Sequence, residues 1–87
     1  MLTEKQVAFL NKEFGILNFE PEQMRPEKLW QLSEDCFGIE CDEERTKAER
    51  DAGLELFHAL QKLLPDEWKF KTPPEVEAML AKQSESA

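Results

Sequence analysis

The chain has 87 residues, of which 40% are hydrophobic, enough for one domain with a small hydrophobic core. Nineteen acidic residues against eleven basic ones give a formal net charge of −8, and this sign argues against binding the phosphates of nucleic acid or an anionic membrane. A basic protein is the kind of partner that such a charge attracts.

The first predicted helix begins with a capping box. Thr3 is placed to accept a hydrogen bond from the amide of Gln6, whose side chain can reach back to the amide of Thr3. The hydrophobic spacing continues to Phe14, and the following Gly15 can adopt the left-handed conformation that ends many helices. The pattern predicts a helix over residues 4–14.

The second predicted helix begins at Pro26, since proline suits a first helical position where an amide would have no partner. Gly38 has the position of a helix-ending glycine, and Ile39 would fold back onto the last turn. We therefore expect a helix over residues 26–37. Its buried stripe is formed by Leu29, Leu32 and Cys36 at helical spacing, and Trp30 and Phe37 are expected to widen it on one side.

The stretch from Thr46 to Leu64 has the clearest helical period, and we expect it to be the central helix around which the others pack. Two starts are open: a cap at Asp42, which gives a helix over residues 43–64, or a cap at Thr46, with Glu49 completing a second capping box. Its apolar stripe comprises Ala52, Leu56, Ala59, Leu60, Leu63 and Leu64.

Two residues of this long helix depart from its pattern. Gly53 lies in the interior, where glycine costs about 0.5–1 kcal/mol against alanine, so the close approach of another helix is its expected reason. Leu54 is apolar but lies on the polar arc. It is either an ordinary exposed leucine or the edge of a contact surface.

Pro65 ends the long helix, and the last predicted helix covers residues 73–82. We expect Trp68 and Phe70, in the connection between them, to close one end of the core. Residues 83–87 contain little to bury and are predicted to form a frayed tail. No stretch alternates with period two, so the expected fold is a single all-α domain over residues 1–82, a bundle of about four helices.

Acidic residues are concentrated between Glu34 and Asp51, where eight acids accompany three basic residues. Three interpretations are open: acids that complement helix N-termini, a solvated charged face, or a surface for a basic partner. The spacing fits no calcium-binding loop. If the cluster binds a partner, the expected contact residues are Glu34, Asp35, Glu40, Asp42, Glu43, Glu44 and Leu54.

The sequence contains no pattern typical of a catalytic, cofactor-binding or metal-binding site. Cys36 and Cys41 are separated by four residues, a spacing that does not match zinc or redox pairs, and His58 is the single histidine. The cysteines fit a reducing compartment, and neither a leader nor a membrane-spanning run is evident, so we expect a cytoplasmic protein without cofactor.

Two segments resemble small uncharacterised acidic helical proteins of bacterial prophages and mobile elements. They are LTEKQVAFLNKEFGI and LWQLSEDCFGIECDEE, which together span about the first half of the chain. The resemblance implies a bacterial or phage accessory protein and assigns no functional residue.

Together these features predict a small, acidic, non-enzymatic module that binds another protein. One option is a partner with a basic surface. Direct binding to nucleic acid or to a membrane is not expected. A mimic of nucleic-acid charge, which would block a basic groove, is one alternative. A self-assembling structural protein, for example a homodimer, is another.

Overall fold

The computed structural model describes residues 2–86, with side chains described through residue 82. This part of the chain forms four α-helices, two short 3-10 turns and no strand, which confirms the all-α prediction. The helices are α1 (Glu4–Phe14), α2 (Pro26–Cys41), α3 (Lys47–Leu63) and α4 (Pro73–Ser86). The 3-10 turns span Pro21–Gln23 and Asp66–Trp68. None of the helices within residues 2–86 combines the length and the apolar character that crossing a membrane requires.

Helix α1 has the predicted bounds because both of its ends are capped as expected. The amide of Gln6 donates to Oγ1 of Thr3 at 3.2 Å, and the amide of Thr3 donates to Oε1 of Gln6 at 2.9 Å. At the other end Gly15 has φ +69°, and its amide donates to the carbonyl of Asn11.

Helix α2 is longer than predicted, because it continues through Gly38 to Cys41. The prediction that Gly38 ends the helix was wrong. Ile39 extends the buried stripe by one more turn and is 6% exposed, and burying a side chain of this size outweighs the roughly 0.5–1 kcal/mol cost of an interior glycine.

Helix α3 begins at Lys47, so the later of the two possible starts is correct. Thr46 and Glu49 form the second capping box, with the amide of Glu49 donating to Oγ1 of Thr46 at 3.2 Å. The predicted range of 43–64 was too long because residues 42–45 form a turn, closed by a hydrogen bond from the Arg45 amide to the Asp42 carbonyl.

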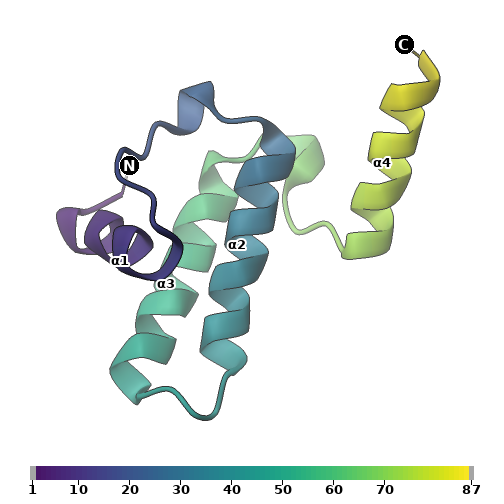
Figure 1. The fold of residues 1–87 in the computed structure, drawn as a ribbon. Coiled ribbons are helices and arrows are strands. Elements are labelled where there is room, and N and C mark those ends of the chain that lie inside the picture. Colours follow the sequence, from purple (N-terminus) through teal and green to yellow (C-terminus); the bar gives the residue numbers. More distant parts are fainter. Residues whose placement is uncertain (1, 87) are drawn as a thin grey trace.

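Helices α2 and α3 form an antiparallel hairpin that provides most of the core (Figure 1). Leu56 and Leu60 are fully buried, as the stripe predicted, and Leu10 of α1 is buried beside them. The helices lie closest at Gly53, where a Cβ would be only 2.8 Å from the Cys36 carbonyl oxygen. The predicted reason for Gly53 is therefore confirmed.

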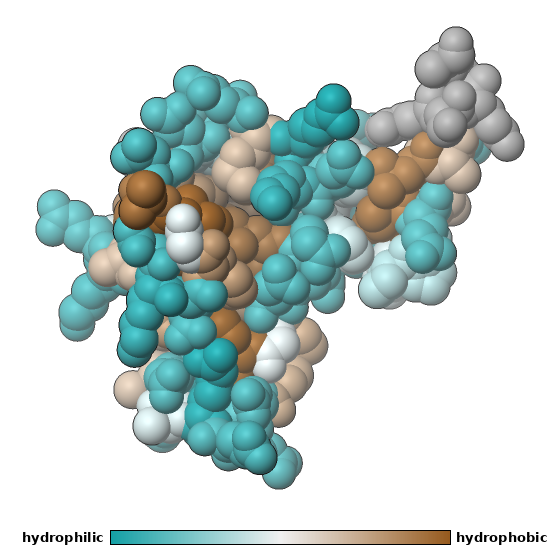
Figure 2. All heavy atoms as spheres, viewed as in Figure 1, coloured by the Kyte–Doolittle hydropathy of each residue, from teal (hydrophilic) through white to brown (hydrophobic). Residues whose placement is uncertain are grey.

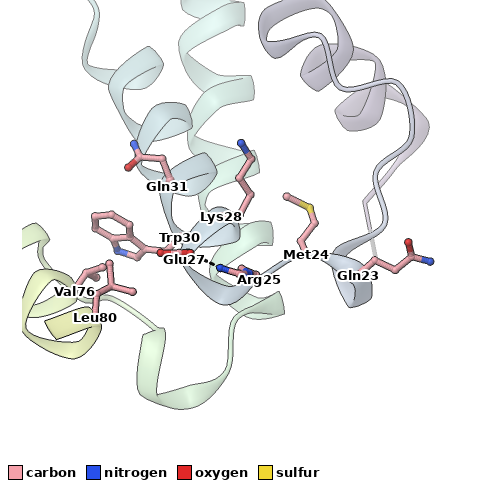
Figure 3. Close-up of a pocket in the computed structure, with 9 residues that line it drawn as sticks. All are labelled: Gln23, Met24, Arg25, Glu27, Lys28, Trp30, Gln31, Val76 and Leu80. Atoms are coloured by element: carbon pink, nitrogen blue, oxygen red, sulfur yellow. Dashed lines mark ion pairs between the residues drawn. The ribbon is translucent and has the colours of Figure 1, made fainter. Parts of the chain in front are cut away.

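Helix α4 lies beside the hairpin rather than against the stripe of α3, so it is not one of the helices that cover the long helix (Figure 1). Its Val76 is buried, and Val76 and Leu80 point toward Trp30 of α2 (Figure 3). The radius of gyration is 13.7 Å, compared with about 12 Å expected for a compact chain of this length. Helix α4 continues past its expected end at residue 82 to Ser86. The predicted frayed tail comprises residues 83–87, of which residue 87 and the side chains of residues 83–86 lie outside the described residues.

The connection between α3 and α4 matches its prediction at one aromatic residue and not at the other. Trp68 is 3% exposed and closes one end of the core. Phe70, by contrast, is 69% exposed and has φ +55°, a left-handed conformation that is rare for a bulky residue. The expectation that Phe70 closes the core was wrong, because its backbone turns there and its amide, not its ring, faces the interior.

Candidate functional site

The turn between α2 and α3 is held in place by local hydrogen bonds. Oδ1 of Asp42 accepts from the amide of Glu44 at 3.0 Å, a pattern by which aspartate side chains stabilise turns. The guanidinium Nε of Arg50 donates to the carbonyl of Glu40 at 2.8 Å, which ties the last turn of α2 to the first turns of α3. The acidic residues of this segment are therefore presented on a fixed backbone.

Arg45 forms ion pairs with three acids around this turn. Its Nη1 lies 3.0 Å from Glu13 and 3.2 Å from Glu49, and its Nε lies 3.6 Å from Asp42. The hydrogen bond to Glu13 is the main reason that the pKa of Arg45 is raised. Because Glu13 lies on α1, these ion pairs connect α1 to the hairpin, and Asp42 has a structural role.

Three acids at the same end of the hairpin have no basic partner among the described residues. The carboxylate of Glu40 accepts only a weak hydrogen bond, from Sγ of Cys41 at 3.4 Å. Glu43 and Glu44 are exposed, and within residues 2–82 no basic side chain forms an ion pair with either carboxylate. We call Glu40, Glu43 and Glu44 the acidic end.

The helix dipole does not explain the acidic end. Glu40 lies in the last turn of α2, where the carbonyl groups point outward and a negative charge is unfavourable. Glu43 and Glu44 precede the Thr46 cap, so they lie outside the first turn of α3, where Glu49 occupies the favourable position.

The remaining acids of the predicted surface point elsewhere. Glu34 and Asp35 are adjacent on α2 and hence about 100° apart around the helix. Asp35 accepts from Nε2 of Gln31 at 3.1 Å and lies beside Phe14 on the side that α1 covers. Partial burial and the neighbouring Asp35 raise the pKa of Glu34. The structure thus brings together the residues of the turn but separates them from Asp35.

Leu54 lies on a partly exposed apolar surface that the sequence did not predict. The ring of Phe37 is 42% exposed, and its centroid lies 5.2 Å from that of Phe57, which is one turn beyond Leu54 on α3. We call Phe37, Leu54 and Phe57 the aromatic face. Phe37 was expected to widen the buried stripe of α2. The signal that could have identified the surface is the spacing of Leu54 and Phe57, which are three residues apart and therefore neighbours on α3, with Phe57 at the flank of the apolar stripe.

A groove of about 610 Å³ separates α4 from the first turns of α2 (Figure 3). Trp30, Val76 and Leu80 form its apolar side, and Arg25 and Glu27 form an ion pair of 3.6 Å at its edge. Figure 2 shows the hydrophobic side of α4 turned toward α2, with hydrophilic residues over most of the face in view. The groove is therefore lined on one side by α4 itself and on the other by the start of α2.

Both cysteine thiols of the chain have a raised pKa. Burial raises the pKa of Cys36 to about 12, and loss of hydration and the hydrogen bond to Glu40 raise the pKa of Cys41. Neither thiol is activated, because reactive cysteines have a lowered pKa. Among residues 2–86 no three His, Cys, Asp or Glu side chains are grouped closely enough to hold a metal ion.

Comparison with protein families, with curated proteins and with solved structures gives no match for this chain. The fold and the site define a small all-α domain with an acidic turn between α2 and α3.

Proposed function

We propose that the protein is a non-enzymatic accessory module, of bacterial or phage origin as its sequence resemblance implies, that binds a protein with a basic surface through the acidic end. The observation that carries this proposal is the position of Glu43 and Glu44, which are exposed, unpaired among the described residues and outside the favourable end of either helix dipole.

Electrostatics explains how such a surface would act. Like charges close together disfavour the folded state unless a partner of opposite charge neutralises them, and a net charge of −8 draws a basic partner from beyond contact distance. The turn is already held by Asp42 and Arg45, so little conformational freedom is lost on binding. The sign of the charge also favours a protein over nucleic acid or an anionic membrane.

Charge reversal at the acidic end tests the proposal. The variant Glu43→Lys/Glu44→Lys should lose the protein that the wild-type chain captures from a cell extract. The matched control is Glu22→Lys/Glu77→Lys, which changes the net charge equally at exposed acids far from the turn, and it should capture that protein as the wild type does. Equal capture by all three chains would refute the role of the acidic end.

The same experiment separates a nucleic-acid charge mimic from a general basic-protein binder. Duplex DNA or RNA added during capture competes for the groove of a nucleic-acid-handling protein. If the duplex releases the captured protein from this chain, the chain is a mimic of nucleic-acid charge. Retention in the presence of duplex assigns a basic surface that is not a nucleic-acid site.

A further inference from the structure

Helix α4 is joined to the hairpin through a residue with a strained backbone. Among the described residues other than glycine, only Phe70 has a positive φ, of +55°, a conformation that a residue with a side chain adopts at a cost. Lys69 before it is extended, with φ −69° and ψ 134°. A change of φ at residue 70 to the ordinary negative range would redirect the whole chain that follows. The position of α4 beside the hairpin therefore depends on this one angle (Figure 1).

Two hydrogen bonds from the hairpin hold the chain in this conformation. The amide of Phe70 donates to Oε1 of Gln61 on α3 at 2.7 Å. The carbonyl of the next residue, Lys71, accepts from Nε1 of Trp30 on α2 at 3.0 Å. Strained backbone persists where the surrounding structure fixes it from more than one side, and here the two anchoring side chains come from different helices.

Gln61 joins the hairpin to this connection through a buried amide. Its side chain is 2% exposed. Nε2 of Gln61 donates to Oγ of Ser33 at 2.9 Å, while Oε1 accepts from the amide of Phe70. If Phe70 moves away, Oε1 loses its donor inside the core, and a buried acceptor without a donor is costly. This cost favours the conformation in which the amide of Phe70 stays bound.

Helix α4 adds little apolar burial to this attachment. Among residues 73–82 the side chain of Val76 is buried, whereas those of Met79 and Leu80 are half-buried. The groove of about 610 Å³ lies between α4 and the first turns of α2, so the two helices do not pack closely along their length (Figure 3). An isolated helix of 14 residues is marginal in water. Helix α4 therefore loses its helical structure once it leaves α2.

We propose that α4 is a two-state element of the fold, with Phe70 as its hinge and Gln61 as the side chain that keeps it closed. In the closed state the hinge is left-handed and Val76 lies against Trp30. In the open state Phe70 relaxes to a negative φ, both anchoring hydrogen bonds are broken, and the side chain of Trp30 becomes accessible. The hinge lies at the end of the hairpin opposite the α2–α3 turn, so it does not depend on the role of the acidic end.

Hydrogen exchange of individual amides tests the hinge with two variants that break the same buried hydrogen bond. Gln61→Leu also removes the acceptor of the Phe70 amide, so that amide and those of α4 should exchange about tenfold faster than in the wild type. Ser33→Ala leaves Oε1 of Gln61 in place. It should speed exchange in α2 and α3 but leave α4 close to the wild type, because α4 exchanges through its own opening. Unchanged exchange of α4 in Gln61→Leu, or an equal rise in both variants, would overturn the proposal.

Substitutions at residue 70 test the hinge angle itself and leave the buried core intact, since Phe70 is exposed. Glycine adopts the left-handed conformation without the cost that alanine bears, and both variants lack the ring. The amides of α4 should therefore exchange about fivefold more slowly in Phe70→Gly than in Phe70→Ala. Equal exchange of α4 in these two variants contradicts a hinge at Phe70, whether or not Gln61→Leu folds.

Discussion

At the scale of single residues, Gly38 and Gly53 can be compared directly, because both lie in helix interiors but have different surroundings. A Cβ at Gly53 would lie 2.8 Å from the backbone oxygen of Cys36 and 3.0 Å from Cγ2 of Ile39. Backbone atoms in a packed hairpin cannot move aside cheaply. At Gly38 a Cβ would meet open space.

Gly53→Ala should therefore destabilise the fold, by about 1–2 kcal/mol, because overpacking outweighs the gain in helix propensity. Gly38→Ala should stabilise the fold by about 0.5–1 kcal/mol, because only the helix propensity changes. Urea unfolding measures the free energy of unfolding of both variants. Destabilisation by Gly38→Ala as large as that by Gly53→Ala would contradict the packing described for the hairpin.

Phe70 is the second residue whose conformation makes a prediction. Its φ of +55° costs a residue with a side chain about 1–2 kcal/mol, and its ring is 69% exposed. Phe70→Gly should therefore be more stable than Phe70→Ala by about 1 kcal/mol, because both lose the ring but only glycine relieves the strain. Equal thermal unfolding of the two variants would show that residue 70 is not held in the left-handed region.

These residues also show what the sequence could and could not predict. The reason for Gly53 was predictable, because a glycine in the middle of a strong amphipathic helix lowers its stability unless a neighbouring helix needs the space. The end of α2 was wrongly predicted at Gly38, because the same Phe-Gly-Ile sequence does end α1. In α2 the helix continues through this sequence, since Ile39 is buried by α3. A local pattern can be overridden by a contact with a segment that lies many residues away.

At the scale of elements, the helix starts were better predicted than the helix ends. The capping boxes at Thr3 and Thr46 need only residues three apart, and both are formed. The end of α2 and the place of α4 depend on tertiary packing, and neither was predicted correctly. For the candidate site, the sequence predicted the concentration of acids. It did not predict that Arg45 would form an ion pair with Asp42 while Glu43 and Glu44 are unpaired among the described residues.

The capping box of α3 predicts a pH dependence. Hydrogen bonds from the amide and hydroxyl of Thr46 lower the pKa of Glu49. A carboxyl with a lowered folded pKa contributes stability above its unfolded pKa of about 4.3, and the contribution is lost as the pH falls through the folded value. Glu49→Gln keeps an acceptor oxygen but no charge, so it should be less stable than the wild type at pH 7.

The difference between the two chains should shrink below the ordinary glutamate pKa of about 4.3 and disappear once Glu49 is protonated. Comparing chains removes the opposite contribution of Glu34, whose pKa is raised. Glu22→Gln, at an exposed acid, should match the wild type throughout. Chemical unfolding at several pH values measures this, and a difference that stays constant with pH would show that the Glu49 charge does not stabilise the cap.

At the scale of the whole molecule, the four helices contribute unequally to the core. The hairpin and α1 bury Leu10, Leu56 and Leu60 completely, whereas the described part of α4 buries mainly Val76 against α2. A unit with few buried apolar contacts opens at lower free energy than the rest of a protein. The dimensions of 43 × 27 × 20 Å agree with this arrangement, in which α4 extends to one side (Figure 1).

Val76→Asp should therefore release α4 while the hairpin stays folded, because a charged side chain cannot be buried against Trp30 without a partner. Hydrogen exchange should show lost protection in α4 and little change in α2 and α3. The comparison is Leu60→Ala, which leaves a cavity in the shared core and should cost about 2–5 kcal/mol, with protection lost in α2 and α3 alike. If Val76→Asp lowers the protection of α2 and α3 as much as Leu60→Ala does, α4 is an integral part of the core. In that case the hairpin, which presents both the acidic end and the aromatic face, would not be stable without α4.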